Sequence, residues 1–152
     1  MKHFGIERII SGGQTGADRG GLDAAIALGI PHDGYCPRGR KAEDGRVPDC
    51  YYLTELESDD YRVRTKRNVA RAHATIVFVF GPLDGGSLLT VKFCHELRTQ
   101  CHVVDLKATR PMGLKSFLKT AKPKCLNVAG NRESKSPGIQ RRVKEVLVEV
   151  LS

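Results

Sequence analysis

Residues 74–80, ATIVFVF, constrain the fold of this chain more than any other segment. The run is almost entirely apolar and rich in β-branched and aromatic side chains. It lacks the apolar–polar alternation of a strand that has one face in water. A strand of this kind is typically the middle of a parallel sheet that helices cover on both faces. The segment therefore predicts an α/β fold.

The rest of the chain supports this prediction, because strand-like and helix-like segments alternate along it. Further strands are expected at 6–10, 32–36, 50–56, 101–106 and 125–130, and helices at 18–28, 58–73, 87–100, 111–121 and 136–151. Gly29 should end the first helix, Ser58 should cap the second, and Pro137 should lie in the first turn of the last. The 152 residues fit one domain, 1–152, with a mostly parallel sheet between helical layers.

The charge balance indicates which partners the surface attracts. Lys and Arg number 25 against 17 Asp and Glu, a formal net charge of +8, which favours phosphates, oxyanions, nucleic acid or an acidic membrane. Nucleic acid is disfavoured because no stacking aromatic residues accompany a basic stripe. No membrane association is expected, since no apolar run approaches about 18 residues and the N-terminus lacks the apolar part of a secretory signal.

The cysteines indicate a reducing compartment. Five are present, an odd number without any C-x-x-C spacing, so we expect free thiols and a cytoplasmic location: Cys36, Cys50, Cys94, Cys101 and Cys125. A zinc site is the alternative, built from Cys94-His95 and Cys101-His102. These pairs fall on a predicted helix and the next strand, so we favour buried structural thiols and no metal.

A glycine-rich stretch, SGGQTGAD at 11–18, joins the first predicted strand to the first helix. Ligands of open parallel sheets bind beyond the carboxyl ends of the strands. Gly12, Gly13 and Gly16 would let bare backbone approach an anion at the start of the helix, and a side chain at Gly13 should block that approach. The pattern is neither G-x-G-x-x-G nor a P-loop. The alternative is a tight turn in which Asp18 caps the helix.

A second loop of the same kind, GPLDGGS at 81–87, follows the buried strand and enters another helix. Gly85, Gly86 and Ser87 would place a second helix N-terminus at the ligand. For both loops to reach one groove, we predict that the first strand lies beside 74–80.

Three further segments offer polar groups. In the long loop 37–50, Arg38, Arg40 and Lys41 could close over an anion, or they could be solvated. Arg64, Asn68 and Arg71 share one helix face, for which a solvated basic face is the favoured interpretation and a ligand role for Asn68 the alternative. After the last strand, the rim of the sheet carries Asn131, Arg132 and Ser134, or these lie in a plain surface loop.

Catalytic residues are harder to find. The five histidines are scattered, and no serine or cysteine lies in a G-x-S-x-G elbow. This pattern favours a binding protein over an enzyme.

Four segments in order resemble the molybdenum (cofactor) carrier family: SGGQTGADRGGLDAA, YCPRGRKAEDG, GPLDGGSLLT and LNVAGNRESKSPGI. The resemblance spans nearly the whole chain. It implies a Rossmann-like domain, a homo-oligomer (dimer or tetramer), and binding of the molybdenum cofactor (molybdopterin) or a related nucleotide-like anion. One departure is VARAH after Asn68, where the family leads us to expect a short acidic turn. The residues expected to bind the ligand are Gly12, Gly13, Gln14, Thr15, Gly16, Asp18, Arg38, Arg40, Asn68, Gly85, Gly86, Ser87 and Asn131.

The main alternative is an enzyme, a nucleotide N-glycosidase similar to the phosphoribohydrolases of the same superfamily, or a nucleotide-sensing domain. Those hydrolases carry P-G-G-x-G-T-x-x-E. In GGSLLTVKFCHE the first acid after Thr90 is Glu96, about two turns further on, so the expected carboxylate is displaced.

Overall fold

The computed structural model describes residues 2–107 and 113–152, which form an α/β structure around a five-stranded sheet. In spatial order the strands are β2 (His32–Asp33), β1 (Arg8–Ile10), β9 (Cys125–Gly130), β7 (Ala74–Val79) and β8 (Gln100–Asp105). Every neighbouring pair is parallel. All six residues of β7 are buried, as the apolar run predicts. The parallel α/β sheet is therefore confirmed.

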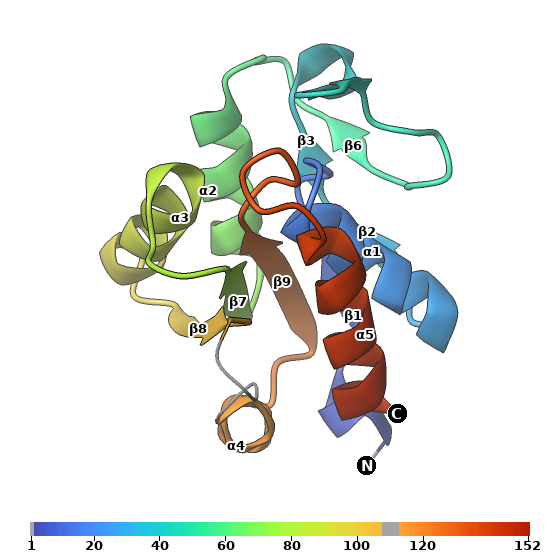
Figure 1. Ribbon diagram of the computed structural model, residues 1–152, viewed down its shortest axis with the longest axis vertical. Coiled ribbons are helices and arrows are strands. Elements are labelled where there is room, and N and C mark those ends of the chain that lie inside the picture. Colours follow the sequence, from blue (N-terminus) through green and yellow to red (C-terminus); the bar gives the residue numbers. More distant parts are fainter. Residues whose placement is uncertain (1, 108–112) are drawn as a thin grey trace.

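Helices cover both faces of the sheet (Figure 1). On one side α1 (Ala17–Leu28), α4 (Leu114–Ala121) and α5 (Ile139–Leu151) share the main apolar core with the strands. On the other side α2 (Tyr61–Arg71) and α3 (Gly85–Glu96) enclose a smaller cluster around Val69, Phe93 and Cys94. The result is the three-layer Rossmann-like sandwich that the sequence predicts. None of the described helices is long and apolar enough to cross a membrane.

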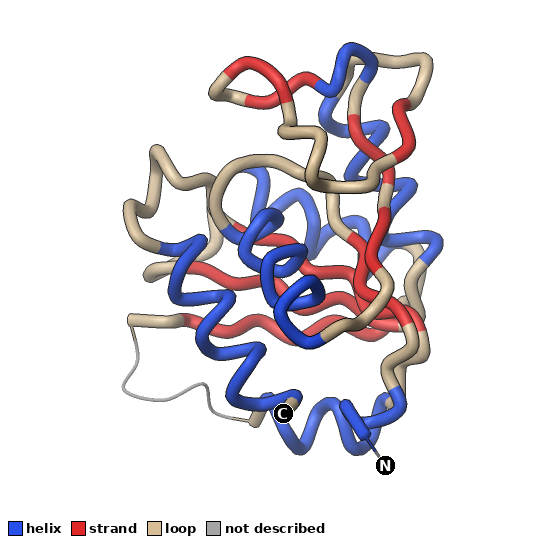
Figure 2. The backbone as a smooth tube through the Cα atoms, turned by 90° about the vertical axis from the view of Figure 1, so that its right-hand side faces the viewer, coloured by secondary structure: helices blue, strands red, loops and turns tan. Residues whose placement is uncertain are grey.

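Short elements lie beyond the carboxyl end of β2, at the top of Figure 2. β3 (Tyr35–Cys36) pairs in parallel with β6 (Thr54–Glu55), and the short helix η2 (Arg38–Arg40) leads into the hairpin of β4 (Lys41–Ala42) and β5 (Gly45–Arg46). The predicted single strand 32–36 is broken at Gly34. There the chain passes so close to Ser11 that a Cβ would lie 2.0 Å from its carbonyl oxygen, and the chain leaves the main sheet.

The predicted strand order is wrong in one respect. β1 does not lie beside β7, because β9, the last strand of the chain, pairs with both of them. If the strands are counted from β9, the spatial order reads 3-2-1-4-5, the order of a doubly wound Rossmann sheet. The two ends of the chain also meet. The 3₁₀ helix η1 (Lys2–Gly5) packs on α5, and His3 Nδ1 lies 2.6 Å from the Leu151 carbonyl oxygen.

Several predicted helix starts shift by a few residues. Gly16, not Asp18, is the N-cap of α1. Asp60, not Ser58, caps α2 by accepting a hydrogen bond from the Arg62 amide. α3 begins at Gly85, before the predicted start at 87, and α5 begins at Ile139, after Pro137. The predicted start of α4 at residue 111 lies outside the described residues.

Candidate functional site

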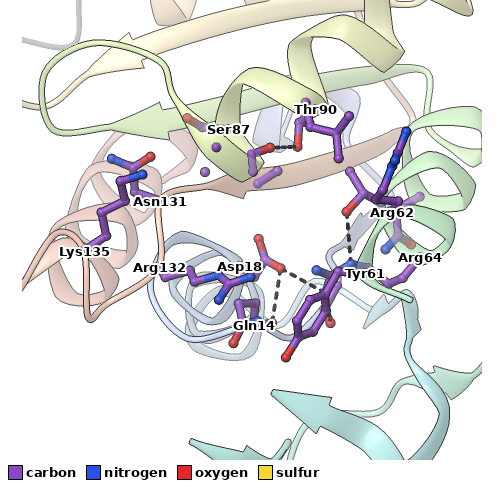
Figure 3. Close-up of a pocket in the computed structure, with 18 of the residues that line it drawn as sticks. Gln14, Asp18, Tyr61, Arg62, Arg64, Ser87, Thr90, Asn131, Arg132 and Lys135 are labelled. Carbon is purple, nitrogen blue, oxygen red and sulfur yellow. Dashed lines mark hydrogen bonds and ion pairs between the residues drawn. The ribbon is translucent and has the colours of Figure 1, made fainter. Parts of the chain in front are cut away.

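A cavity of about 560 Å³ opens at the carboxyl end of β9, between α2 and α3. Figure 3 shows side chains from four parts of the chain around it. The lining comes from the glycine loop and start of α1, the first two turns of α2, the first turns of α3, and β9 with the loop that follows it. Both predicted glycine loops therefore reach one cavity. They do so although β9 separates their strands, because the cavity spans the end of that central strand.

The start of α3 forms one wall of the mouth. Gly85, Gly86 and Ser87, all predicted, line it, and the Ser87 hydroxyl accepts a hydrogen bond from the Asp84 amide at 3.1 Å. The Asp84 side chain accepts from the Ser87 amide in a capping box, so the amides of Gly85 and Gly86 are the ones that can attract an anion. A Cβ at Gly86 would meet nothing within 4 Å, so the space beside this backbone is open.

The loop after β9 brings cations to the same mouth. Lys135 lies 2.5 Å from Asp84, and the Arg132 guanidinium lies 5.0 Å from the centre of the Tyr61 ring. The predicted Asn131 also lines the cavity, where its side-chain amide donates to Ser136 at 2.9 Å. The sequence interpretation left this loop undecided. Its position next to the central strand makes it a principal wall.

A buried ion pair lies inside the mouth. Arg64 Nη1 lies 3.6 Å from Asp18 Oδ2 and donates to the Gly12 carbonyl at 2.8 Å, while Asp18 accepts from the Gln14 amide at 3.1 Å. Arg64 is 7% exposed, so the predicted solvated basic face is wrong at this position. Burial raises the pKa of Asp18, and the charge of Arg64 opposes that rise. Burial lowers the pKa of Arg64, which the charge of Asp18 in turn opposes.

Uncharged polar side chains are also buried in the lining. The amide of Asn68 is held by the backbone of Tyr35, with which it exchanges two hydrogen bonds of 2.9 Å. Thr90 donates its hydroxyl proton to the Gly86 carbonyl at 2.9 Å. Asn127 donates to Thr75 at 3.3 Å. Asn68 therefore lines the cavity as predicted, although its side chain already supports the fold.

Three predicted residues of the first glycine loop lie behind the wall. Gly13, Thr15 and Gly16 are absent from the lining, whereas Gly12, Gln14 and Asp18 belong to it. Gly13 has φ 76°, and a Cβ there would lie 2.5 Å from Leu53, so a side chain would not enter the cavity as expected.

The other two residues hold this loop in place. Gly16 packs so tightly that a Cβ would lie 2.3 Å from the Asn131 carbonyl. Thr15 donates to Glu43, which also accepts two hydrogen bonds from Ser134.

The predicted arginines of the long loop do not reach the cavity. Arg40 is buried and donates to the carbonyls of Val47, Pro48 and Tyr51, so it holds its own loop together. Arg38 is exposed on η2, outside the lining. Arg132 and Lys135 occupy the mouth instead. Sequence reasoning gave no signal for Lys135, Tyr61 or Asn127, since only the fold brings them together.

Metal ligands do not gather anywhere in the described ranges, where no three His, Cys, Asp or Glu side chains are placed to hold an ion. Cys94 lies beside Cys101, and the hydrogen bond between them lowers the pKa of the Cys94 thiol. Cys94 is buried within the cluster between α2 and α3.

Comparisons with known proteins extend these findings. Residues 9–151 match the family model described as the circularly permutated YpsA SLOG family. A crystal structure from Syntrophus aciditrophicus, named Putative molybdenum carrier protein, is 40% identical, with a TM-score of 0.91. The match covers 97% of this chain and 95% of that one. Among curated proteins, none matches.

Proposed function

Because this chain belongs to the circularly permutated YpsA SLOG family, we propose that it binds and carries a small organic anion in the cavity between α2 and α3. The ligand we infer is the molybdenum cofactor (molybdopterin) or a related nucleotide-like anion. The name of the Syntrophus aciditrophicus protein supports a molybdenum-related ligand. The observation that carries the proposal is that the start of α3 and two cations, Arg132 and Lys135, meet at one cavity mouth.

The permuted chain order explains why this mouth suits a phosphate. In a doubly wound sheet the loop after the central first strand approaches the phosphates of the ligand. Here β9 holds that central position, and the loop that follows it carries Arg132 and Lys135. The start of α3 faces the same space from the other side of the crevice. An anionic group between them would interact with both side-chain charge and helix amides.

The dimensions and polarity of the cavity fit a pterin or nucleotide. Ligand cavities commonly measure about 300–1,000 Å³, and this one measures about 560 Å³. Arg132 and Lys135 are exposed at its mouth, while the buried polar side chains of its lining include Asp18, Asn68, Thr90 and Asn127. A ligand with an anionic tail and an uncharged, hydrogen-bonding ring matches this arrangement. Arg132 and Lys135 would hold the tail, and the buried polar groups would face the ring.

Calorimetric titration with an anionic pterin, pterin-6-carboxylate, tests the proposal. Lys135→Glu should weaken binding at least tenfold, since it reverses a charge at the mouth. The matched control is Lys144→Glu on the exposed face of α5, which changes the net charge equally but lies outside the lining. Equal weakening by both variants would mean that only the overall charge attracts the anion. Mass spectrometry of ligand that copurifies with the protein would identify the natural one.

A carrier is favoured over a nucleotide N-glycosidase because of where the carboxylates lie. Glu96 pairs with Lys66 at 3.7 Å near the other end of α3 and does not line the cavity. The three carboxylates that do line the cavity already have partners: Asp60 caps α2, Asp84 pairs with Lys135, and Asp18 pairs with Arg64. Incubation with nucleoside monophosphates, followed by chromatography for released base, tests the difference. Release of base at a catalytic rate would replace the carrier proposal with the enzyme.

The homo-oligomer implied by the resemblance and the cytoplasmic location inferred from the cysteines remain proposals. Light scattering after size-exclusion chromatography would measure the mass in solution, for which we expect twice or four times the 16.7 kDa of one chain. Fractionation of cells that express the chain would place it in the cytoplasmic fraction.

A further inference from the structure

Asp18 has a carboxylate oxygen that the protein itself does not use fully. Its Oδ2 accepts a hydrogen bond from the Gln14 backbone amide and forms the ion pair with Arg64. In Figure 3 the other oxygen points away from these partners, into the space between Asp18 and Ser87. The residue is 7% exposed, so this acceptor lies inside the cavity rather than in bulk water. A buried carboxylate oxygen with spare capacity favours a ligand that supplies N–H or O–H donors.

Gln14 adds an independent indication. It is 5% exposed and lines the cavity, and its side-chain Nε2 is a buried donor with no hydrogen-bond acceptor among the described residues. The amide orientation is fixed because Oε1 accepts from two backbone amides, those of Thr15 at 3.1 Å and Glu43 at 2.9 Å. If the side-chain amide were flipped, its N–H₂ group would face the N–H groups of Thr15 and Glu43, and no hydrogen bond could form. An unpaired buried donor is costly. Nε2 has almost no accessible surface, so a ligand acceptor would pair with it once the Gln14 side chain shifts toward the cavity.

We propose that Asp18 determines the specificity of the cavity by accepting hydrogen bonds from the adjacent ring N–H and amino group of a 2-amino-4-oxopyrimidine edge. Guanine and pterin share this edge, in which a ring carbonyl lies next to the two donors. Gln14 supplies a donor of the kind that this carbonyl requires. The inference rests on the proposed function, since it concerns the ring end of the ligand whose anionic end lies at Arg132 and Lys135.

The chemistry of the alternatives explains the selectivity. Adenine presents an unprotonated ring nitrogen where guanine presents N–H, and a carboxylate repels such a lone pair. Hypoxanthine keeps the ring N–H but lacks the amino group, so it offers one donor instead of two. Lumazine carries a second carbonyl where pterin carries the amino group, and that oxygen would face the Asp18 carboxylate. A site that hydrogen-bonds a substrate group discriminates strongly against analogues without it.

Two sets of probes measure this selectivity and separate the two ring sources. The first is the 5′-monophosphates of guanosine, inosine and adenosine, which share ribose and phosphate. The second is pterin-6-carboxylate and lumazine-6-carboxylate, which share ring size and charge. We expect the wild-type protein to prefer guanosine monophosphate within the first set, or pterin-6-carboxylate within the second, by about ten- to a hundredfold in dissociation constant, as for a hydrogen bond to a charged group. Preference within one set only would identify guanine or pterin as the source.

Asp18→Asn tests the residue. An asparagine can still accept from the Gln14 amide through its oxygen, but it presents N–H₂ to the cavity. The preference for pterin over lumazine should therefore collapse or reverse. Asp84→Asn is the matched control because it removes one negative charge from the same lining. It should change the affinity for both probes alike and leave their ratio intact. A thermal melt identifies any unfolded variant, and in that case the wild-type ratios alone decide.

The outcomes separate this inference from the function on which it rests. Equal wild-type affinity for all members of each set, with binding still weakened by Lys135→Glu, would overturn the role of Asp18 and leave the anion carrier standing. A pterin preference that survives in folded Asp18→Asn would do the same. Failure of every probe to bind would overturn both.

Discussion

Replacing Arg64 with methionine removes the cation from the buried pair at the centre of the cavity. Methionine is apolar and unbranched, so it can occupy part of the space of the arginine stem. Two groups lose their partner: Asp18, 3.6 Å away, and the Gly12 carbonyl, which accepts at 2.8 Å. Removing one member of a buried ion pair costs about 3–5 kcal/mol, because the other charge stays buried. For a domain of this size each kcal/mol lowers Tm by about 2–4 °C, so we expect a loss of about 6–20 °C.

A double-mutant cycle separates the pair from simple loss of packing. Asp18→Asn in the Arg64→Met background removes the stranded charge, so the double variant should be more stable than Arg64→Met alone. Urea unfolding at neutral pH, followed by circular dichroism, gives the four free energies of unfolding. Additive effects of the two substitutions would show that the two side chains do not stabilise each other.

The pH dependence supplies a second check. Burial already raises the pKa of Asp18 above its ordinary 3.8, and loss of Arg64 should raise it further. Below pH 3.8 the carboxyl is protonated in both the folded and the unfolded state, so it carries no penalty. As the pH rises from there to the folded-state pKa, the unfolded state releases its proton first and folded stability falls. The deficit of Arg64→Met should therefore be smallest near pH 4 and grow toward neutrality. A deficit that is constant with pH would refute this account.

Three further predictions follow from the same geometry. Ligand affinity should fall with salt between 50 and 500 mM, and Lys135→Glu should flatten the slope in calorimetry, because exposed charges are screened over about 10 Å at 0.1 M; an unchanged slope would remove Lys135 from the anion site. Gly13→Val should lower the free energy of unfolding by about 1–3 kcal/mol, because the backbone at φ 76° is strained for a residue with a side chain. The ligand affinity of the folded variant should stay within about threefold of the wild-type value. A folded variant that cannot bind would mean that Gly13 faces the ligand. Glu43→Gln should speed hydrogen exchange at the Ser134 amide and lower the free energy of unfolding by about 1 kcal/mol or less. Hydrogen bonds hold the pKa of Glu43 below its usual value. As the pH falls through that pKa, the exchange rate of the wild-type protein should therefore approach that of the variant.

The local pattern of the sequence predicts the layers but not their order. ATIVFVF identifies a central strand because a strand that is buried on both faces has an almost entirely apolar sequence. The sequence of a strand does not indicate which strands lie next to it in the sheet. The assumption that β1 lies beside β7 fails because β9 lies between them. In the permuted family the unit that usually comes first in a Rossmann sheet comes last. For the same reason the sequence leaves open whether the loop at Arg132 and Lys135 lines the site or is a plain surface loop.

The candidate site was predictable where the backbone is special and less so where side chains decide. Gly85 and Gly86 follow a strand and open a helix, which fixes their place at the carboxyl edge. Arg64 on a strongly basic helix is expected to be solvated, and only the packing of α2 against the glycine loop shows that Asp18 compensates its charge. Arg40 was expected to bind the ligand. Its N–H groups instead donate to three carbonyls of its own loop.

A crystal structure of the protein with pterin-6-carboxylate at saturating concentration tests the central claim most directly. The account predicts ligand density in the cavity between α2 and α3, with the carboxylate near Lys135 and the start of α3, and the amino edge of the ring against Asp18. Density at another surface, with this cavity filled only by water, would contradict it.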